Sequence, residues 1–277
     1  MTDQNSFNHI AGGRSHFVSA GANRIHYVTV GNGDRALVFV HGWACHLGFW
    51  HEQVAALADK ARLILIDLPG HGRSDPPETA CTMDLFAEAV LAAVRDAGVE
   101  RATFIGHSMG AAVLCGVYRL APEKVAALVS VDGLLCRLPG TPAEARALIG
   151  AFASAQYPAH AREFIRSLFP VPGTEVLCGR VTLEMLATPQ RVMLGGMRAM
   201  LDPELPDWAL EKVGVPLLVI NARTPWWNSA YEKHVRALSP RVDYTFLEGA
   251  GHFLMLEQPA IFNLRLGEWL KKQDLIR

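Results

Sequence analysis

Residues 104–110 read Phe-Ile-Gly-His-Ser-Met-Gly, a short apolar run that leads into a Gly-x-Ser-x-Gly motif. The run has the composition of a buried strand, and residues 111–120 (AAVLCGVYRL) are typical of a helix. A strand that turns directly into a helix strains the residue at the turn, and only small neighbours two positions away permit this. Gly106 and Gly110 meet that requirement. A glycine-rich turn without chemistry is the plainer interpretation, but the context favours Ser108 as a nucleophile.

A nucleophilic serine needs a base, because its hydroxyl is nearly inert at its own pKa. The chain has eleven histidines, so position has to select one of them. Residues 242–247 alternate as a strand and lead into Gly-Ala-Gly-His-Phe at 249–253, and a helical pattern follows at 259–271. A loop histidine is often only solvated. A histidine placed between glycines after the final strand, downstream of a serine turn, is the expected base, so we predict this role for His252.

Two backbone N–H groups are needed to stabilise the oxyanion of a tetrahedral intermediate. One comes from the residue after the nucleophile, here Met109, and the other from the loop after an early strand. Residues 37–40 form such a strand and end in His-Gly-Trp, which makes the amide of Trp43 the second candidate. Gly42 would let the loop pass close to the reacting carbonyl, and we expect His41 to brace the loop.

Four segments occur in a fixed order: HGW at 41–43, DLPGHGRSD at 67–75, GHSMG at 106–110 and GAGHF at 249–253. Together they resemble the α/β-hydrolase fold family over roughly residues 15–272. The resemblance implies a mostly parallel central sheet with helices on both faces, a helical cap, and a nucleophile, acid and histidine in that chain order. It also implies a structural role for His71, in the second of these segments.

The acid departs from the commonest pattern of that family, which places it after the penultimate strand. Here that strand is residues 216–221, and the loop at 222–229 contains no Asp or Glu. The next acid, Glu232, falls inside a helical pattern. Some branches of the family carry the acid after the preceding strand instead, and in this chain residues 127–131 form that strand and end in Asp132.

We therefore predict that Asp132 orients His252, since an acid at an adjacent strand end can reach the far nitrogen of the histidine. Two alternatives stay open. Asp132 and Gly133 are also a strong turn signal, so the aspartate could be a turn residue alone. Asn228 could act as a neutral orienting group in its place.

Alternating strand and helix patterns predict an α/β domain with a parallel sheet, preceded by antiparallel strands at about 14–20 and 23–30. The helices expected in this domain include those at about 49–59 and 229–238. The strand signal stops between about residues 134 and 212, where helical pieces are broken by prolines and glycine. We predict a core domain formed by residues 1–133 and 213–277, and a helical cap formed by 134–212. The cap carries nine apolar side chains that collectively suggest an enclosed site: Phe152, Tyr157, Phe164, Leu168, Phe169, Met185, Met193, Met197 and Met200. Trp226 and Trp227 are expected to line the same site.

The chain has 277 residues, is 50% hydrophobic and carries a net charge of −1. This length suits one α/β domain with a lid, and the charge gives no case for nucleic acid or a membrane surface. A polar N-terminus predicts no signal peptide. Five cysteines without CxxC spacing are typical of free thiols in the cytoplasm. No spacing of histidines and acidic residues indicates a metal site, and no glycine-rich loop is typical of a phosphate-binding site for a cofactor. We expect a monomer or homodimer acting on a small molecule.

These features predict a serine hydrolase that cleaves an ester, lactone or related acyl or C–C bond of a small, largely apolar substrate through an acyl-enzyme. Two alternatives come from other classes. A few α/β-hydrolase-fold proteins are cofactor-free dioxygenases that use a histidine and an acid at this position, and the Pro225-Trp226 loop resembles theirs. A non-catalytic small-molecule receptor on the same fold is the other alternative.

Overall fold

A computed structural model describes residues 10–137, 142–205 and 207–277. Most of the polar N-terminal segment on which the signal-peptide prediction rests, residues 1–9, lies outside the described residues. So do residues 138–141 and 206 of the predicted cap. None of the described helices is long and apolar enough to cross a membrane.

Within the described residues, eight strands form one sheet in the order β1-β2-β4-β3-β5-β6-β7-β8. The first two strands and the β2–β4 pair are antiparallel, and every later pair is parallel. The fold is therefore the mostly parallel α/β sheet that the sequence predicts. The bounds are β1 (Arg14–Ala20), β2 (Asn23–Val30), β3 (Ala36–Val40), β4 (Arg62–Ile66), β5 (Ala102–His107), β6 (Val125–Val131), β7 (Leu217–Ala222) and β8 (Val242–Leu247).

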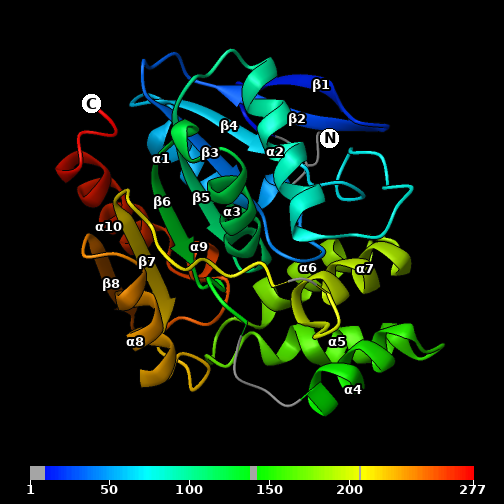
Figure 1. The fold of residues 1–277 in the computed structure, drawn as a ribbon. Coiled ribbons are helices and arrows are strands. Elements are labelled where there is room, and N and C mark those ends of the chain that lie inside the picture. Colours follow the sequence, from blue (N-terminus) through cyan, green and yellow to red (C-terminus); the bar gives the residue numbers. More distant parts are fainter. Residues whose placement is uncertain (1–9, 138–141, 206) are drawn as a thin grey trace.

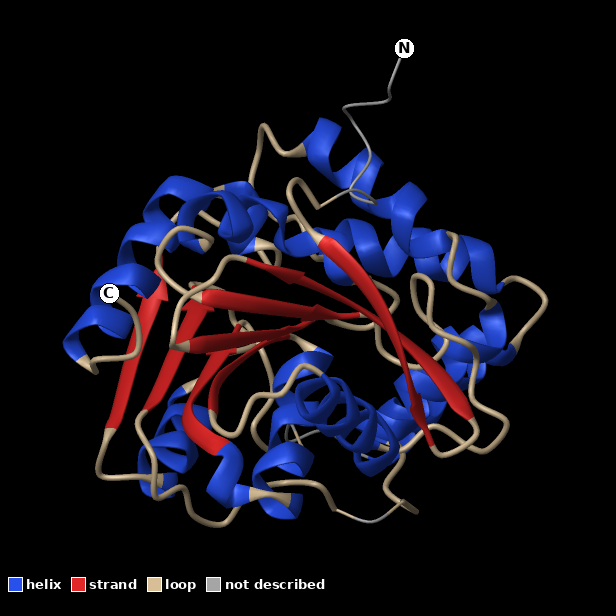
Figure 2. Ribbon diagram, turned by 90° about the horizontal axis from the view of Figure 1, so that it is seen from above, coloured by secondary structure: helices blue, strands red, loops and turns tan. Residues whose placement is uncertain are grey.

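Helices cover both faces of this sheet (Figures 1 and 2). Helices α2 and α3 pack against each other, and α1 packs against α10. The central strands lie between these layers, and every residue of β3 and β5 is buried. The core helices are α1 (His51–Leu57), α2 (Met83–Asp96), α3 (Met109–Leu120), α8 (Ser229–Leu238), α9 (Leu254–Glu257) and α10 (Pro259–Lys272), with short 3-10 helices at Leu47–Trp50 and Pro122–Lys124.

Four further helices follow β6 and precede β7 in the chain. We call them the cap: α4 (Pro142–Ala153), α5 (Tyr157–Ser167), α6 (Glu175–Leu186) and α7 (Gln190–Leu201). Figure 1 shows them grouped beyond the end of the sheet toward which β6 and β7 point. The carboxyl ends of parallel strands meet at one edge of a sheet, so the cap stands over the loops that leave these strands.

Two elements differ from the sequence-based expectation. The helix expected over about 49–59 is divided into a 3-10 turn and the short α1. The turn begins at Leu47 because the side chain of His46 accepts a hydrogen bond from the amide of Gly48 at 3.2 Å. Helix α9 was not expected, since a single turn is too short to show a helical period.

A buried aspartate at the end of β4 joins three segments of the core. The carboxylate of Asp67 accepts hydrogen bonds from the ring of His26 at 2.7 Å and from the amides of Leu47 and Arg73 at 2.8 and 3.0 Å. Burial alone would raise the pKa of Asp67, but these donors outweigh it and lower the pKa. The ionised side chain thus fixes the loops on either side of the β4 end.

We expect Asp67→Ala to lower the free energy of unfolding by about 3 to 5 kcal/mol, because it leaves buried donors without their acceptor. Urea unfolding monitored by tryptophan fluorescence measures the change. Asp34→Ala, at an exposed ion pair with Arg277, is the matched control and should cost about 0.5 kcal/mol or less. Equal effects of the two substitutions would contradict the structural role of Asp67.

Candidate active site

The turn between β5 and α3 holds Ser108 in a strained backbone conformation, with φ of 52° and ψ of −119°. Glycines make this turn possible through close packing. A β-carbon on Gly106 would lie 2.6 Å from the backbone of Gly110, and one on Gly133 would lie 2.9 Å from the carbonyl oxygen of Ser108. The turn also puts Met109 at the first position of α3, where its N–H has no acceptor within the helix.

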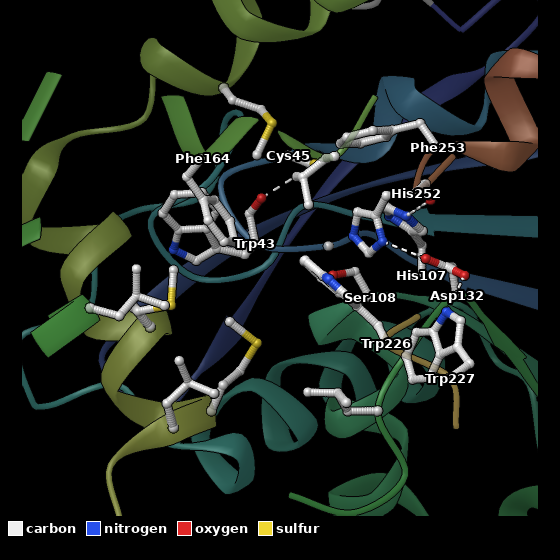
Figure 3. A pocket seen from close by; sticks show the side chains of 18 of the residues that line it. Trp43, Cys45, His107, Ser108, Asp132, Phe164, Trp226, Trp227, His252 and Phe253 are labelled. Carbon is white, nitrogen blue, oxygen red and sulfur yellow. Dashed lines mark hydrogen bonds and ion pairs between the residues drawn. The ribbon is translucent and has the colours of Figure 1, made fainter. Parts of the chain in front are cut away.

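Asp132 and His252 meet, although 120 residues separate them in the chain. His252 Nδ1 donates to Asp132 Oδ2 at 2.6 Å (Figure 3). Asp132 follows β6 with a φ of 42° and is only 2% exposed. Because an ionised carboxylate can only accept, the proton lies on Nδ1 and leaves the lone pair on Nε2.

The other carboxylate oxygen of Asp132 is also occupied. Oδ1 accepts from the amide of Ala222 at 2.6 Å and from the indole N–H of Trp227 at 2.7 Å. Ala222 is the last residue of β7, and Trp227 lies in the loop that follows. This is the loop in which the sequence has no Asp or Glu. Asn228 instead caps α8 by accepting from the amide of Tyr231, at 3.0 Å. The structure therefore brings Asp132, and not Asn228, into hydrogen-bond contact with His252.

The backbone around His252 is fixed by contacts that the sequence did not reveal. Its amide donates to the carbonyl of Leu168 in the cap at 3.0 Å, and its carbonyl accepts from His107 Nε2 at 3.0 Å. Glu257 accepts from the amides on either side, those of Gly251 at 2.7 Å and Phe253 at 3.1 Å. Of these contacts, the sequence hinted at one alone, because His107 stands directly before Ser108.

The loop after β3 passes close to the serine. A β-carbon on Gly42 would lie 3.0 Å from the β-carbon of Ser108. His41 braces this loop, since its Nδ1 donates to the carbonyl of Gly42 at 2.8 Å and its Nε2 accepts from the amide of Leu68 at 3.0 Å. The indole of Trp43 turns toward the cap and donates to the carbonyl of Met193 at 2.7 Å. Its main chain remains the predicted oxyanion donor.

Ser108 and His252 open onto a cavity of about 430 Å³ between the core and the cap. Figure 3 shows the serine, the histidine and the two tryptophans 226 and 227 around it. Five of the nine predicted cap side chains contribute to its lining, while Phe152 instead packs on Trp43. The lining is mostly apolar: Gly42, Trp43, Cys45, His107, Ser108, Asp132, Leu134, Leu148, Phe164, Leu168, Met185, Met197, Met200, Leu201, Pro225, Trp226, Trp227, Asn228, His252 and Phe253.

No group of three or more histidine, cysteine or acidic side chains suited to a metal ion occurs among the described residues. Glu232 lies in α8, where it pairs with Arg236 at 2.8 Å. The residues that meet at the cavity are thus those of a serine, histidine and aspartate constellation.

Three buried histidines near this edge of the sheet are held neutral. Burial lowers the pKa of His41 to about 3 and that of His71 to about 4. Burial, followed by the nearby ring of His252, holds the pKa of His107 well below its ordinary value. The hydrogen bonds of His41 agree, because one ring nitrogen donates while the other accepts.

We therefore expect the stability of the protein to fall as the pH drops below about 6.5, the pKa of an unfolded histidine. The unfolded chain then binds protons that the folded chain excludes, and each such histidine costs up to about 1.4 kcal/mol per pH unit. Urea unfolding at about pH 7, 6 and 5 measures the slope. A constant free energy of unfolding over this window would contradict the neutral assignment.

Comparison with known proteins identifies the family of the chain. The family model described as the alpha/beta hydrolase family matches residues 37–263. Since this match covers most of the sequence, the chain belongs to the α/β-hydrolase family. It is an enzyme of that family, with the mostly parallel sheet and flanking helices described above.

The chain is similar to several individual proteins of known description. The chain is 28% identical to the dihydrolipoyllysine-residue acetyltransferase component of the acetoin cleaving system of Cupriavidus necator, over 92% of this chain and 68% of that protein. It is 41% identical to a pimeloyl-[acyl-carrier protein] methyl ester esterase of Methylococcus capsulatus, although that match covers only 42% of each chain. The crystal structure of an esterase from Rhodococcus sp. ECU1013 superposes with a TM-score of 0.78 at 27% identity, covering 94% of this chain and 98% of that one.

Proposed function

We propose that the protein is a serine hydrolase that cleaves a carboxylic ester or lactone of a small, largely apolar acyl compound through an acyl-enzyme. The observation that carries the proposal is the hydrogen bond between His252 and Asp132 beside a strained Ser108, all three facing one cavity. Two of the relatives described above are esterases, which supports the same reaction class.

Each role follows from a position in this geometry. Ser108 attacks the carbonyl carbon while His252 Nε2 takes its proton, and Asp132 holds the ring in the required tautomer. The amides of Trp43 and Met109 stabilise the oxyanion. His252 then protonates the leaving alcohol, and a water molecule activated by the same ring releases the acyl group.

The lining of the cavity supports the proposed apolar substrate. Among the described residues that line it there is no lysine or arginine, and methionine, leucine and aromatic side chains predominate. A charged acyl group would lose its hydration without gaining a counter-ion, which costs several kcal/mol. A neutral acyl chain of small or medium length gains instead from the apolar walls, roughly 25 cal/mol per Å² buried. We therefore assign the cavity to an uncharged, apolar acyl group.

A panel of p-nitrophenyl esters of graded acyl length tests this function. Turnover should rise with length until the acyl chain fills the cavity and then fall, and an ester with a terminal carboxylate should react far more slowly than its neutral analogue. Ser108→Ala should lower kcat by about 10³ or more, with the melting temperature nearly unchanged. Residual activity within a few-fold of the wild type would exclude Ser108 as the nucleophile.

Asp132→Asn tests the relocated acid. The amide can donate to Nδ1 and so favours the wrong tautomer of His252, and kcat should fall by about 10³ to 10⁴. Asn228→Ala, which removes the cap of α8 and one polar side chain of the cavity lining but no hydrogen bond to Asp132 or His252, is the control and should leave kcat within a few-fold. Steady-state kinetics on the best ester gives both numbers.

Two measurements on the wild-type protein distinguish the proposed hydrolase from the receptor and the dioxygenase. Labelling of Ser108 by a fluorophosphonate probe would count against a non-catalytic receptor. Oxygen consumption with a hydroxyquinolone substrate, in the absence of ester turnover, would favour the dioxygenase.

A further inference from the structure

The loop after β7 contains no Asp or Glu, but its Trp227 donates a hydrogen bond to the carboxylate of Asp132. We propose that Trp227 is a positioning residue for Asp132: its indole N–H holds one carboxylate oxygen so that the other faces His252. This inference rests on the proposed function, because it assigns a task within the same catalytic triad.

The geometry of the carboxylate is the first support. Oδ2 accepts from His252 at 2.6 Å, while Oδ1 accepts from Trp227 Nε1 at 2.7 Å and from the amide of Ala222 at 2.6 Å. Figure 3 shows the indole nitrogen of Trp227 pointing at the carboxylate from the side away from His252. Donors to Oδ1 fix the rotation of the carboxyl group, so Oδ2 stays aimed at Nδ1.

The placement of the indole is the second support. Trp227 is 6% exposed and its ring packs on that of Tyr231, with 4.9 Å between the centroids. The hydroxyl of Tyr231 donates to the carbonyl of Gly133 at 2.8 Å and accepts from the amide of Leu135 at 3.1 Å. The same two aromatic residues therefore hold both the side chain of Asp132 and the backbone that follows it.

The neighbouring Trp226 shows that this role is specific to position 227. Trp226 is 43% exposed, and its ring centroid lies 6.2 Å from that of His252, whereas the indole that donates to the carboxylate is that of Trp227. Both tryptophans contribute to the cavity lining, but the hydrogen bond to the buried acid comes from Trp227. We assign the positioning role to Trp227 and a substrate contact alone to Trp226.

Loss of the indole N–H has a defined electrostatic consequence. A charge-assisted hydrogen bond removes negative charge density from the carboxylate. Without it, the carboxylate attracts the proton on His252 more strongly, which favours the protonated ring. Other titratable groups face this pair. His107 and Glu257 contact the ring and loop of His252, and Tyr244 and Arg223 lie on the side of Asp132. All four are unchanged by a substitution at Trp227.

Trp227→Phe tests the proposal, since it removes the N–H donor and keeps an aromatic ring. We expect kcat on the best ester to fall about 10-fold to 100-fold, with KM changed less than about three-fold. We also expect the acid limb of the pH profile of kcat/KM to move to higher pH. The downfield NMR signal of the His252 Nδ1 proton should shift or broaden, and this signal can be read without turnover.

Trp269→Phe is the matched control. The indole of Trp269 in α10 also donates to a carboxylate, Asp243 Oδ2 at 2.8 Å, but this carboxylate is half-exposed and Trp269 does not line the cavity. Its loss should lower the melting temperature while kcat, the pH profile and the downfield signal stay as in the wild type.

The outcomes separate this inference from the proposed function. An active wild type with Trp227→Phe differing only in melting temperature, as in the control, would overturn the positioning role and leave the hydrolase intact. A wild type without ester turnover or fluorophosphonate labelling would overturn the proposed function. In that case a downfield signal altered by Trp227→Phe would still support the contact with Asp132, and an unaltered signal would refute it.

Discussion

The strained turn at Ser108 is the constraint on which the rest of the site depends. A positive φ at a residue with a side chain costs free energy, so the surrounding backbone has to hold it in place. Glycines do so by permitting close approach: Gly106 to Gly110 across the turn, Gly42 from the loop after β3, and Gly133 from the end of β6. The same packing brings the loop with the oxyanion candidate and the segment with the acid beside the serine.

The relocated acid illustrates how a sheet edge tolerates rearrangement. Strands β6 and β7 are parallel neighbours, so the loops after them leave the sheet side by side. A carboxylate from either loop can reach His252. In this chain Asp132 supplies the carboxylate from β6, and the loop after β7 supplies a donor to it in Trp227.

The cap and the core share the task of placing His252. The cap contributes a carbonyl from Leu168, and the core contributes the ring of His107 and the carboxylate of Glu257. Burial raises the pKa of Glu257, against the effect of the two amides that donate to it. His252 is therefore attached by its backbone to the same cap that encloses the apolar cavity.

The sequence alone determined the order of strands and helices, the turn at Ser108 and the candidate residues, because these depend on local patterns and on glycines at fixed spacing. Strand bounds such as 14–20 and 242–247 and helix bounds such as 229–238 agree with the structure for this reason. Only the tertiary structure decided that Asp132 contacts His252 and that Trp227, rather than Trp226, donates to the acid. These contacts join residues about 100 positions apart, and no local period records which way an indole turns when the chain folds.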